Sequence, residues 1–207
     1  MSPSPTPTGS AACTPLLVAH QLSGGPPDHV VIRQLNAAWS AGLHWICGDE
    51  GCGKTSLLRL LAGDLPAQSG RVQAPPGGVF WVNLKGKEHD STTVQGCWQQ
   101  LQASYPHWQV ELQQELEAAL DMAQHRHKPL YMLSTGSRQK VMLVAALASG
   151  ATVTLLDQPF VSLDQLSIRV VKDFLSEASQ HPSRAWIVAD YEVPHELTVT
   201  SVLHLTN

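Results

Sequence analysis

Short, mostly apolar runs alternate with clusters of glycine, proline and polar residues along much of the chain. The runs have the length of buried strands, and the clusters at 24–27 and 75–78 are turn formers. The runs that we predict as strands are 16–19, 30–32, 44–47, 79–82, 153–156 and 185–189. Strands are therefore expected towards both ends of the chain.

A different pattern fills the middle of the chain. From residue 92 to about 124 the composition changes to Gln, Glu, Leu and Ala, and Leu112, Leu116, Ala119 and Leu120 recur at helical spacing. This pattern predicts a mostly helical lobe at about 87–149. Helices inserted between strands favour an α/β core that carries a helical insertion.

One glycine-rich loop carries candidate chemistry, because it fills the G-x-x-x-x-G-K-[ST] pattern completely between a predicted strand and an apolar-faced helix. Its residues are Gly48, Asp49, Glu50, Gly51, Cys52, Gly53, Lys54, Thr55 and Ser56. The glycines let successive backbone N–H groups point inward around phosphate oxygens, and the following helix adds its positive end. Lys54 would contribute a cation, and the Thr55 hydroxyl would bind Mg²⁺. Residue frequencies produce this pattern by accident in roughly one chain in a hundred of this length, so a plain glycine turn is the weaker interpretation.

Composition narrows the class of protein further. The 207 residues suffice for one substantial core, and we expect a single domain at 15–207 behind a disordered Ser-, Thr- and Pro-rich tail at 1–14. With 14% charged residues and a net charge of −4, nothing favours nucleic acid as a partner. The longest apolar run, 141–148, is too short to span a bilayer. The four cysteines lack metal-binding spacing, which is typical of free thiols in a reducing cytosol.

Three further motifs follow the glycine loop in a fixed order. Residues 133–140, Leu-Ser-Thr-Gly-Ser-Arg-Gln-Lys, precede an apolar helix; the strand 153–156 then ends in Asp157 and Gln158, and a short loop reaches Asp164. These segments resemble the LSGGQ signature, the Walker B strand and the D-loop of the ATP-binding-cassette (ABC) transporter family. The resemblance covers nearly the whole chain after the tail. It implies a P-loop NTPase core of the α/β class, with an amino-terminal antiparallel β subdomain and an inserted helical subdomain.

The chemistry of these residues supports the resemblance independently. Asp157 follows a buried strand, at the edge where an α/β sheet meets its ligand, so its carboxylate would hold Mg²⁺ through water opposite Thr55. A lone Asp after an apolar run is usually a turn former, but the phosphate loop upstream favours the metal. Ser134 and Gly136 begin a predicted helix and offer a hydroxyl, N–H donors and a positive dipole end. The resemblance implies that they face the γ-phosphate held by a second cassette.

Several positions depart from the family pattern. Gln158 stands where members that hydrolyse ATP have a glutamate, and an amide can orient water but cannot take its proton. Where the family has its switch histidine, the chain has Asp190 or Tyr191, and His195 comes too late and is expected in an exposed loop. Asn83 is the nearest match to the Q-loop glutamine. Together these changes predict slow or conditional hydrolysis.

Two more departures concern the nucleotide and the signature. Residues 24–28, where the family places an aromatic residue against adenine, contain none, and His29 is the nearest ring. The signature has Thr135 and Ser137 in place of Gly and Gln.

The resemblance implies an ATP-binding subunit that binds Mg-ATP, pairs with another cassette as a homodimer or heterodimer, and drives transport through a separate membrane permease. Such a subunit is expected in the cytoplasm, on the inner face of the membrane through its partner. The length of the chain and its end after the last strand are similar to the short single-cassette subunits, such as the ATPase subunit of the haem exporter of cytochrome c maturation. The alternative is a hydrolysis-deficient regulatory or partner cassette in a heterodimer. Gln158 and the missing switch histidine favour it, and the intact phosphate loop and Asp157 fit both.

Two groups of side chains have a structural interpretation. The basic cluster 125–128 is expected to be a solvated loop rather than a contact with phosphate or a partner. The core is expected to contain the tryptophans on predicted strands, Trp45, Trp81 and Trp186. Trp98 and Trp108 lie in the helical lobe, where burial is favoured over an exposed anchor.

Overall fold

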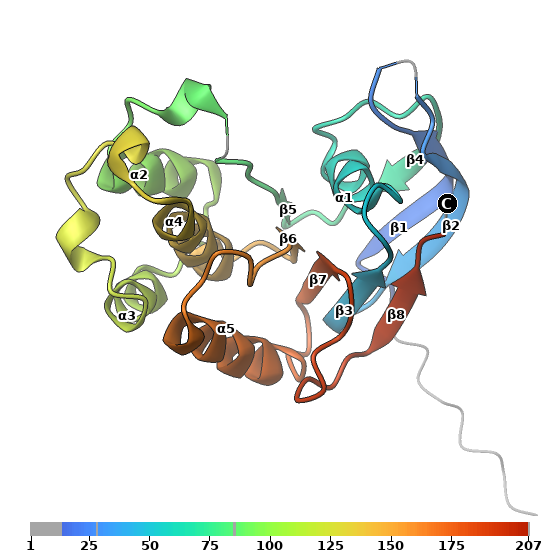
Figure 1. Cartoon of the computed structure of the whole chain (residues 1–207). Coiled ribbons are helices and arrows are strands. Elements are labelled where there is room, and N and C mark those ends of the chain that lie inside the picture. The colour runs from blue at the N-terminus through green and yellow to red at the C-terminus, as the bar shows by residue number, and fades with distance from the viewer. Residues whose placement is uncertain (1–13, 28, 85, 207) are drawn as a thin grey trace, which may run out of the picture.

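The parallel sheet at the centre of the molecule arranges the candidate motifs. The computed structural model describes residues 14–27, 29–84 and 86–206, so the predicted tail, apart from Thr14, lies outside the described residues. Within them, five parallel strands form one sheet in the order β5-β6-β7-β3-β8 (Figure 1). The strands are β3 (Gly42–Cys47), β5 (Val79–Phe80), β6 (Val153–Asp157), β7 (Ala185–Asp190) and β8 (Ser201–His204).

The side chains of the central strands alternate between two apolar clusters, one on each face of the sheet. Trp45 and Val188 belong to one cluster, whereas Ile46 and Ile187 belong to the other. Strands covered on both faces are near-continuous apolar runs, which is the pattern that made β3, β6 and β7 recognisable in the sequence.

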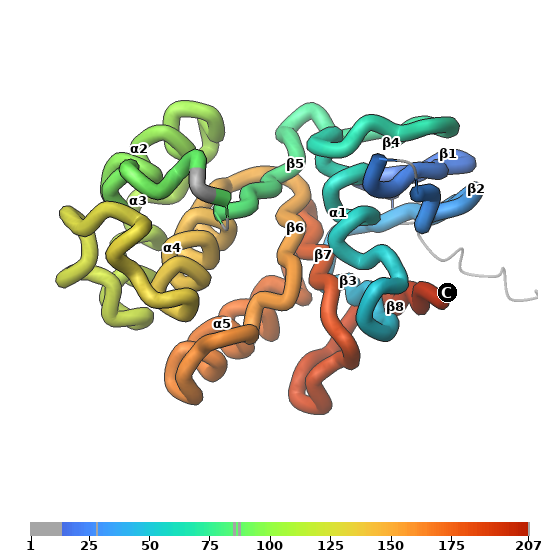
Figure 2. The backbone as a smooth tube through the Cα atoms, turned by 45° about the horizontal axis from the view of Figure 1, so that its top comes forward, coloured from blue at the N-terminus to red at the C-terminus, as the bar shows by residue number. Residues whose placement is uncertain are grey.

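A second, antiparallel sheet lies beside the first near the amino end. It has the order β2-β1-β4, and its strands are β1 (Leu17–Gly24), β2 (Ile32–Trp39) and β4 (Ser69–Gln73). Helix α1 (Lys54–Ala62) packs against both sheets, and Figure 2 shows it between them. Its buried leucines share one cluster with side chains of both sheets, such as Trp39 of β2 and Ile187 of β7. The expected antiparallel β subdomain is present.

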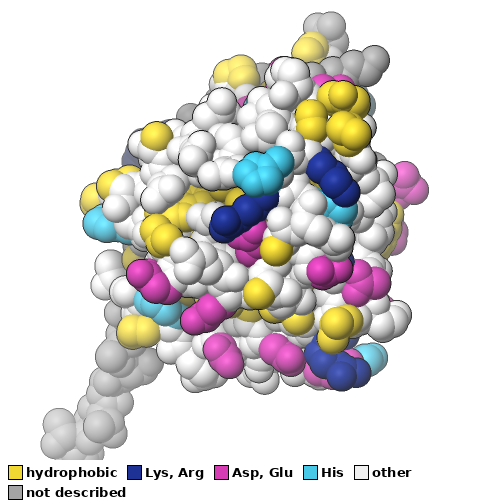
Figure 3. All heavy atoms as spheres, turned by 90° about the vertical axis from the view of Figure 1, so that its left-hand side faces the viewer, with side chains coloured by type: hydrophobic (Ala, Val, Ile, Leu, Met, Phe, Trp, Pro, Cys, Tyr) yellow, Lys and Arg dark blue, Asp and Glu magenta, His cyan; other side chains and the backbone are white. Residues whose placement is uncertain are grey.

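The other face of the parallel sheet packs against α5 (Gln165–Ala178) and the helical part of the chain. That part contains α2 (Val94–Ser104), α3 (Val110–Ala119), α4 (Thr135–Ala148) and the short 3₁₀ helices η1 (Lys87–His89), η2 (Ala123–His125) and η3 (Leu130–Met132). Every residue of α4 from Val141 onwards is buried, and the Trp98 ring of α2 donates a 3.0 Å hydrogen bond to the Val141 carbonyl. On the outer face of these helices, charged side chains of both signs are interspersed with scattered apolar ones (Figure 3).

The structure corrects two of the sequence expectations. The predicted strand 79–82 is shorter, because only Val79 and Phe80 pair with β6, and Trp81 after them is half-buried rather than a core residue. The basic cluster is not simply a solvated loop: Arg126 forms a bidentate ion pair with Glu117, a carboxylate that is only 3% exposed. The preference for burial is confirmed for Trp98, which is 2% exposed. Among the described residues, no helix combines the length and the apolar character needed to cross a bilayer.

Candidate functional site

Three loops that carry predicted site residues meet at the carboxyl edge of the parallel sheet, because parallel strands end at the same edge. The register sets Cys47, the last residue of β3, beside Asp190 of β7, and Asp157 of β6 beside Ala189 of β7. The glycine loop, the Asp157–Gln158 pair and the Asp190–Tyr191 pair therefore lie next to one another, although long stretches of chain separate them.

The glycine loop has the backbone conformation that its sequence predicts. Gly51 and Gly53 have φ values of +81° and +99°, in a region that residues with a side chain rarely adopt, and Gly53 directly precedes α1. Lys54, the first residue of the helix, is only 6% exposed. Its Nζ donates hydrogen bonds of 2.5 Å and 2.8 Å to the carbonyls of Gly48 and Asp49. The loop thus curls around its own lysine and turns the amino end of α1 towards the sheet edge.

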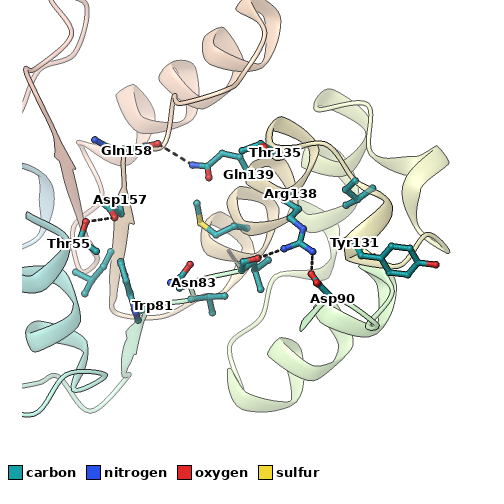
Figure 4. Close-up of a pocket in the computed structure, with 15 residues that line it drawn as sticks. Thr55, Trp81, Asn83, Asp90, Tyr131, Thr135, Arg138, Gln139, Asp157 and Gln158 are labelled. Atoms are coloured by element: carbon teal, nitrogen blue, oxygen red, sulfur yellow. Dashed lines mark hydrogen bonds and ion pairs between the residues drawn. The ribbon is translucent and has the colours of Figure 1, made fainter. Parts of the chain in front are cut away.

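The Thr55 hydroxyl and the Asp157 carboxylate meet directly beside this loop. Thr55 Oγ1 donates a 2.7 Å hydrogen bond to Asp157 Oδ2 (Figure 4). Asp157 Oδ1 is buried and has no hydrogen-bond partner among the described residues. A buried carboxylate oxygen that lacks a partner, next to a hydroxyl oxygen, is an all-oxygen donor set of the kind that Mg²⁺ prefers. The residues present therefore fit the metal that the sequence predicts.

Gln158 is held by its backbone at the start of the loop that follows β6. Its φ is +45°, which is uncommon for a residue with a side chain. Its N–H donates a 2.8 Å hydrogen bond to the Ala189 carbonyl, and its own carbonyl accepts a 3.2 Å hydrogen bond from the Gln139 side chain. Contacts with β7 and α4 thus fix an unfavourable backbone conformation directly after Asp157, as expected where a side chain must be aimed at one point.

The signature segment caps α4 and attaches it to the same loop. The Ser134 hydroxyl accepts a 3.1 Å hydrogen bond from the Ser137 N–H, which makes Ser134 the N-cap of α4. A Cβ on Gly136 would lie 2.3 Å from the Ser162 carbonyl oxygen, so only glycine fits there. Lys140 pairs with Asp164 at 2.7 Å, and its hydrogen bond, with those of Ser167, holds the pKa of Asp164 well below its usual range.

A pocket of about 540 Å³ separates the sheet edge from the helical part. Thr55, Asp157 and Gln158 line one side, and Asn83 contributes to the wall between the two parts (Figure 4). Signature residues line the other side, including Thr135, Arg138 and Gln139.

Arg138 holds the rim of this pocket together. It donates hydrogen bonds to the carbonyls of Leu84 and Leu130 and forms an ion pair with Asp90. Sequence reasoning missed Arg138, Gln139 and Lys140 as structural contacts. The available signal was their position: they are polar side chains that immediately precede the long apolar run of α4.

The loop after β7 completes the site. Asp190 ends the strand, and burial raises the pKa of its carboxyl, although its hydrogen bond from the Tyr191 N–H opposes that shift. The Tyr191 ring lies over Lys54, with Nζ 4.6 Å from the ring centroid. His195 is exposed in the following loop, as expected. Among the predicted residues in the described part of the chain, Ser134 and Gly136 lie at the amino end of α4, and Asn83 lies in the pocket wall between the sheet and the helical part.

Comparisons with known proteins agree with this geometry. Residues 32–161 match the ABC transporter family. The chain is 26% identical over 200 residues to the taurine import ATP-binding protein TauB of Escherichia coli strain K12, across 88% of this chain and 74% of that protein. The same protein of Shigella dysenteriae is 27% identical over 202 residues, with the same coverage.

Solved structures resemble the fold at lower sequence identity. An ABC transporter ATP-binding protein from Pyrococcus furiosus superposes with a TM-score of 0.71 at 20% identity, over 91% of this chain and 96% of that one. An RNase-L inhibitor reaches a TM-score of 0.70 at 21% identity, over 86% of this chain and 34% of that one. The fold alone therefore does not name a process, but the family match spans the glycine loop, the signature and Asp157. The chain belongs to the ABC transporter family, as an ATP-binding subunit.

Proposed function

We propose that this subunit binds Mg-ATP at the sheet edge between β3 and β6 and hydrolyses it slowly. The observation that carries the proposal is the pairing of Thr55 with Asp157 beside the glycine loop, which leaves Asp157 Oδ1 buried without a hydrogen-bond partner in the described part of the chain. Thr55 and Asp157 would hold Mg²⁺, which supplies charge neutralisation at the phosphates when bound. The loop N–H groups and Lys54 would orient the phosphates of ATP.

Slow hydrolysis follows from the residue at position 158. Gln158 emerges next to Asp157 and lines the pocket, so its amide can hold a water molecule there. An amide cannot accept the proton of that water, and a missing general base typically lowers a rate ~10²–10⁴-fold. Asp190 and Tyr191 occupy the place of the family's switch histidine, and neither a carboxylate nor a phenol reproduces an imidazole that titrates near neutral pH.

The partner of the subunit would be a membrane permease, with a second cassette completing each nucleotide site. One glycine loop leaves the outer side of a γ-phosphate open, and the amino end of α4 from another cassette offers N–H donors and a positive dipole end for it. In such an arrangement the chain would lie at the cytoplasmic face of a membrane, bound to its permease. The two TauB relatives are import subunits by name, which favours an importer.

The second candidate function is a cassette that binds ATP without hydrolysing it and pairs with a catalytic cassette. Gln158 is the observation that favours it, because the glutamate of the partner cassette would then act as the general base at the other nucleotide. The two functions share the phosphate loop and differ in the rate of phosphate release by the purified protein.

Calorimetry and a phosphate-release assay together test the proposal. Lys54→Ala removes a charge-assisted contact to phosphate, so the affinity for ATP with Mg²⁺ should fall by about 1.5–3 kcal/mol, roughly ten- to a hundred-fold. Equal affinities of wild type and Lys54→Ala would refute the assignment of the loop. Phosphate release is then measured for the protein alone and with a candidate partner cassette. Slow release alone supports the first function, and release only in the mixture supports the second.

A further inference from the structure

Tyr191 makes a contact that its position in the sequence does not predict. It follows β7 in a loop and is 51% exposed, yet its ring covers the Lys54 ammonium, with Nζ 4.6 Å from the ring centroid. The Tyr191 N–H donates a 2.8 Å hydrogen bond to Asp190 Oδ1, which fixes the backbone that carries the ring. An ammonium at this distance from an aromatic face is attracted by the electron density of the ring.

The contact completes the surroundings of the Lys54 ammonium. An ammonium has three N–H donors: two bond to the carbonyls of Gly48 and Asp49, and the third makes a long, weak contact of 3.9 Å with Cys52 Sγ. The ring of Tyr191 lies over the same nitrogen. The lysine therefore has its partners within its own chain, and phosphate oxygens can reach it only by replacing some of them.

We propose that Tyr191 is a positioning residue that holds the Lys54 ammonium against its own loop and thereby competes with the phosphates of the nucleotide. The proposal rests on the nucleotide-binding function proposed above and adds a determinant of affinity to it. When phosphate oxygens take up the ammonium, the contact with the ring is given up, and the free energy of that contact is subtracted from the free energy of binding. A smaller side chain at position 191 should therefore bind nucleotide more tightly.

The geometry also indicates which part of the Tyr191 side chain makes the contact with Lys54. The contact uses the face of the ring, so a phenylalanine should preserve it and an aliphatic side chain should abolish it. Exposed cation–π contacts have a strength that corresponds to about a 2–5-fold change in an equilibrium constant. Asp190, the residue before Tyr191, also attracts the Lys54 ammonium. Asp190 is present in every Tyr191 variant, so its contribution is the same in all of them.

Calorimetric titration of the full-length protein with ATP and Mg²⁺ tests the proposal. Tyr191→Leu should bind about 2–5-fold more tightly than wild type, Tyr191→Phe should restore the wild-type affinity, and Tyr191→Trp should bind more weakly, because indole attracts cations best. In a Lys54→Ala background, Tyr191→Leu should have no effect, because the cation that the ring holds is gone. Unchanged or weaker binding by Tyr191→Leu, or an effect that persists without Lys54, would overturn the competition.

A second measurement needs no nucleotide. Ring currents should shift the Lys54 Hε resonances upfield in NMR spectra of wild type and Tyr191→Phe, and Tyr191→Leu should lose this shift. Loss of the shift in Tyr191→Leu supports the contact, and identical Lys54 resonances in all three proteins would overturn it. If the wild type binds no nucleotide, both the proposed function and the competition fail. If it binds and Tyr191→Leu binds equally well, only the competition fails.

Discussion

The Thr55 hydroxyl donates a 2.7 Å hydrogen bond to the Asp157 carboxylate across a sequence separation of 102 residues. Two neighbouring segments of the fold bring them together. Thr55 lies in the first turn of α1, directly after the loop that leaves β3, and Asp157 is the last residue of β6. The whole helical part of the chain lies between them in sequence. The Thr55–Asp157 contact is therefore set by the sheet and α1, although the helical part lies between the two residues in sequence.

Replacing Asp157 should uncouple nucleotide binding from Mg²⁺. Asp157→Asn keeps the size of the side chain and removes its charge, so the metal loses its only carboxylate partner among the residues proposed to hold it. We expect the affinity for ATP in the presence of Mg²⁺ to fall roughly 10- to 100-fold, as for residues that hold a metal through water. Calorimetry with Mg²⁺ and with EDTA measures the effect.

The EDTA titration is also the control for this variant. Without the metal, wild type and Asp157→Asn should bind ATP equally, because the glycine loop and Lys54 are intact in both. An Asp157→Asn protein that still gains as much affinity from Mg²⁺ as wild type would show that the metal is held elsewhere.

Local patterns predicted the parts of the fold that depend on local chemistry. The apolar runs identified β3, β6 and β7, and the glycine loop could be assigned because its backbone conformation requires glycine at positions 51 and 53. The short β5 was predicted too long, because Trp81 is apolar but faces the pocket rather than pairing in the sheet. An apolar run in the sequence does not show which of its residues pair with a neighbouring strand.

Contacts between distant segments could not be read from the sequence. The sequence predicted that Gly136 faces the phosphate held by a second cassette. The structure gives a further reason for glycine at this position, because the Ser162 carbonyl of the same chain leaves no room for a Cβ. The basic cluster looked like a solvated surface, because a run of charged residues in a loop usually faces water and nothing in the sequence pairs Arg126 with Glu117, nine residues earlier. The structure shows Glu117 buried, with Arg126 neutralising it. Tyr191 could be placed near the nucleotide by its strand, but its contact with Lys54 depends on the loop conformation.

The Arg126–Glu117 pair should be important for stability. Arg126→Ala leaves a carboxylate that is 3% exposed without its bidentate partner. The Arg126 side chain is itself 41% exposed, so water screens the pair, and we expect a loss of about 1–3 kcal/mol. Arg126→Lys should recover only part of this loss, because an ammonium cannot form the paired hydrogen bonds of a guanidinium. Denaturant unfolding measures both variants.

The matched control is the double variant Arg126→Met with Glu117→Gln. Removing both charges avoids a buried unpaired carboxylate, so the double variant should be more stable than Arg126→Ala. Equal free energies of unfolding for wild type and Arg126→Ala would contradict a stabilising role for the pair.

Gln158→Glu should raise the rate of ATP hydrolysis. The substitution supplies a carboxylate beside Asp157 without changing the size of the side chain, and the hydrogen bonds that hold residue 158 use its backbone. We expect a gain of about tenfold or more that stays below the full general-base factor of ~10²–10⁴, because the chain still has Asp190 and Tyr191 where the sequence resemblance predicts a switch histidine. Steady-state phosphate release at saturating ATP measures the gain.

Gln158→Ala controls for the orienting role of the amide. It should hydrolyse ATP more slowly than wild type while binding it with similar affinity, since the loop and the metal-holding residues are unchanged. Wild-type turnover of several per second, which is near typical enzyme rates, would contradict the impaired site. A Gln158→Glu variant whose rate equals that of wild type would contradict the predicted gain and would make the missing histidine or the altered signature the tighter limit.

ATP should promote pairing of cassettes through the amino end of α4. The sequence suggests Gly136→Asp as a substitution that blocks this pairing. Its Cβ would collide with the Ser162 carbonyl of the same chain, so a loss of pairing could come from misfolding. Thr135 avoids this difficulty, because it is exposed and is the first residue of α4. An aspartate there suits the helix dipole, yet it repels a γ-phosphate presented by a second cassette.

Light scattering with ATP and Mg²⁺ tests this expectation. The wild-type mass should rise towards that of a dimer, alone or with a partner cassette, because slow hydrolysis prolongs the ATP-bound state and ATP contacts both cassettes in the closed pair. Thr135→Asp should remain monomeric while its own phosphate loop still binds ATP, and Thr135→Gly, which restores the family's glycine, should pair as well as wild type or better. If ATP raises the mass of Thr135→Asp as much as that of wild type, α4 does not face the nucleotide of a second cassette. If no mixture changes mass, ATP does not drive pairing at all.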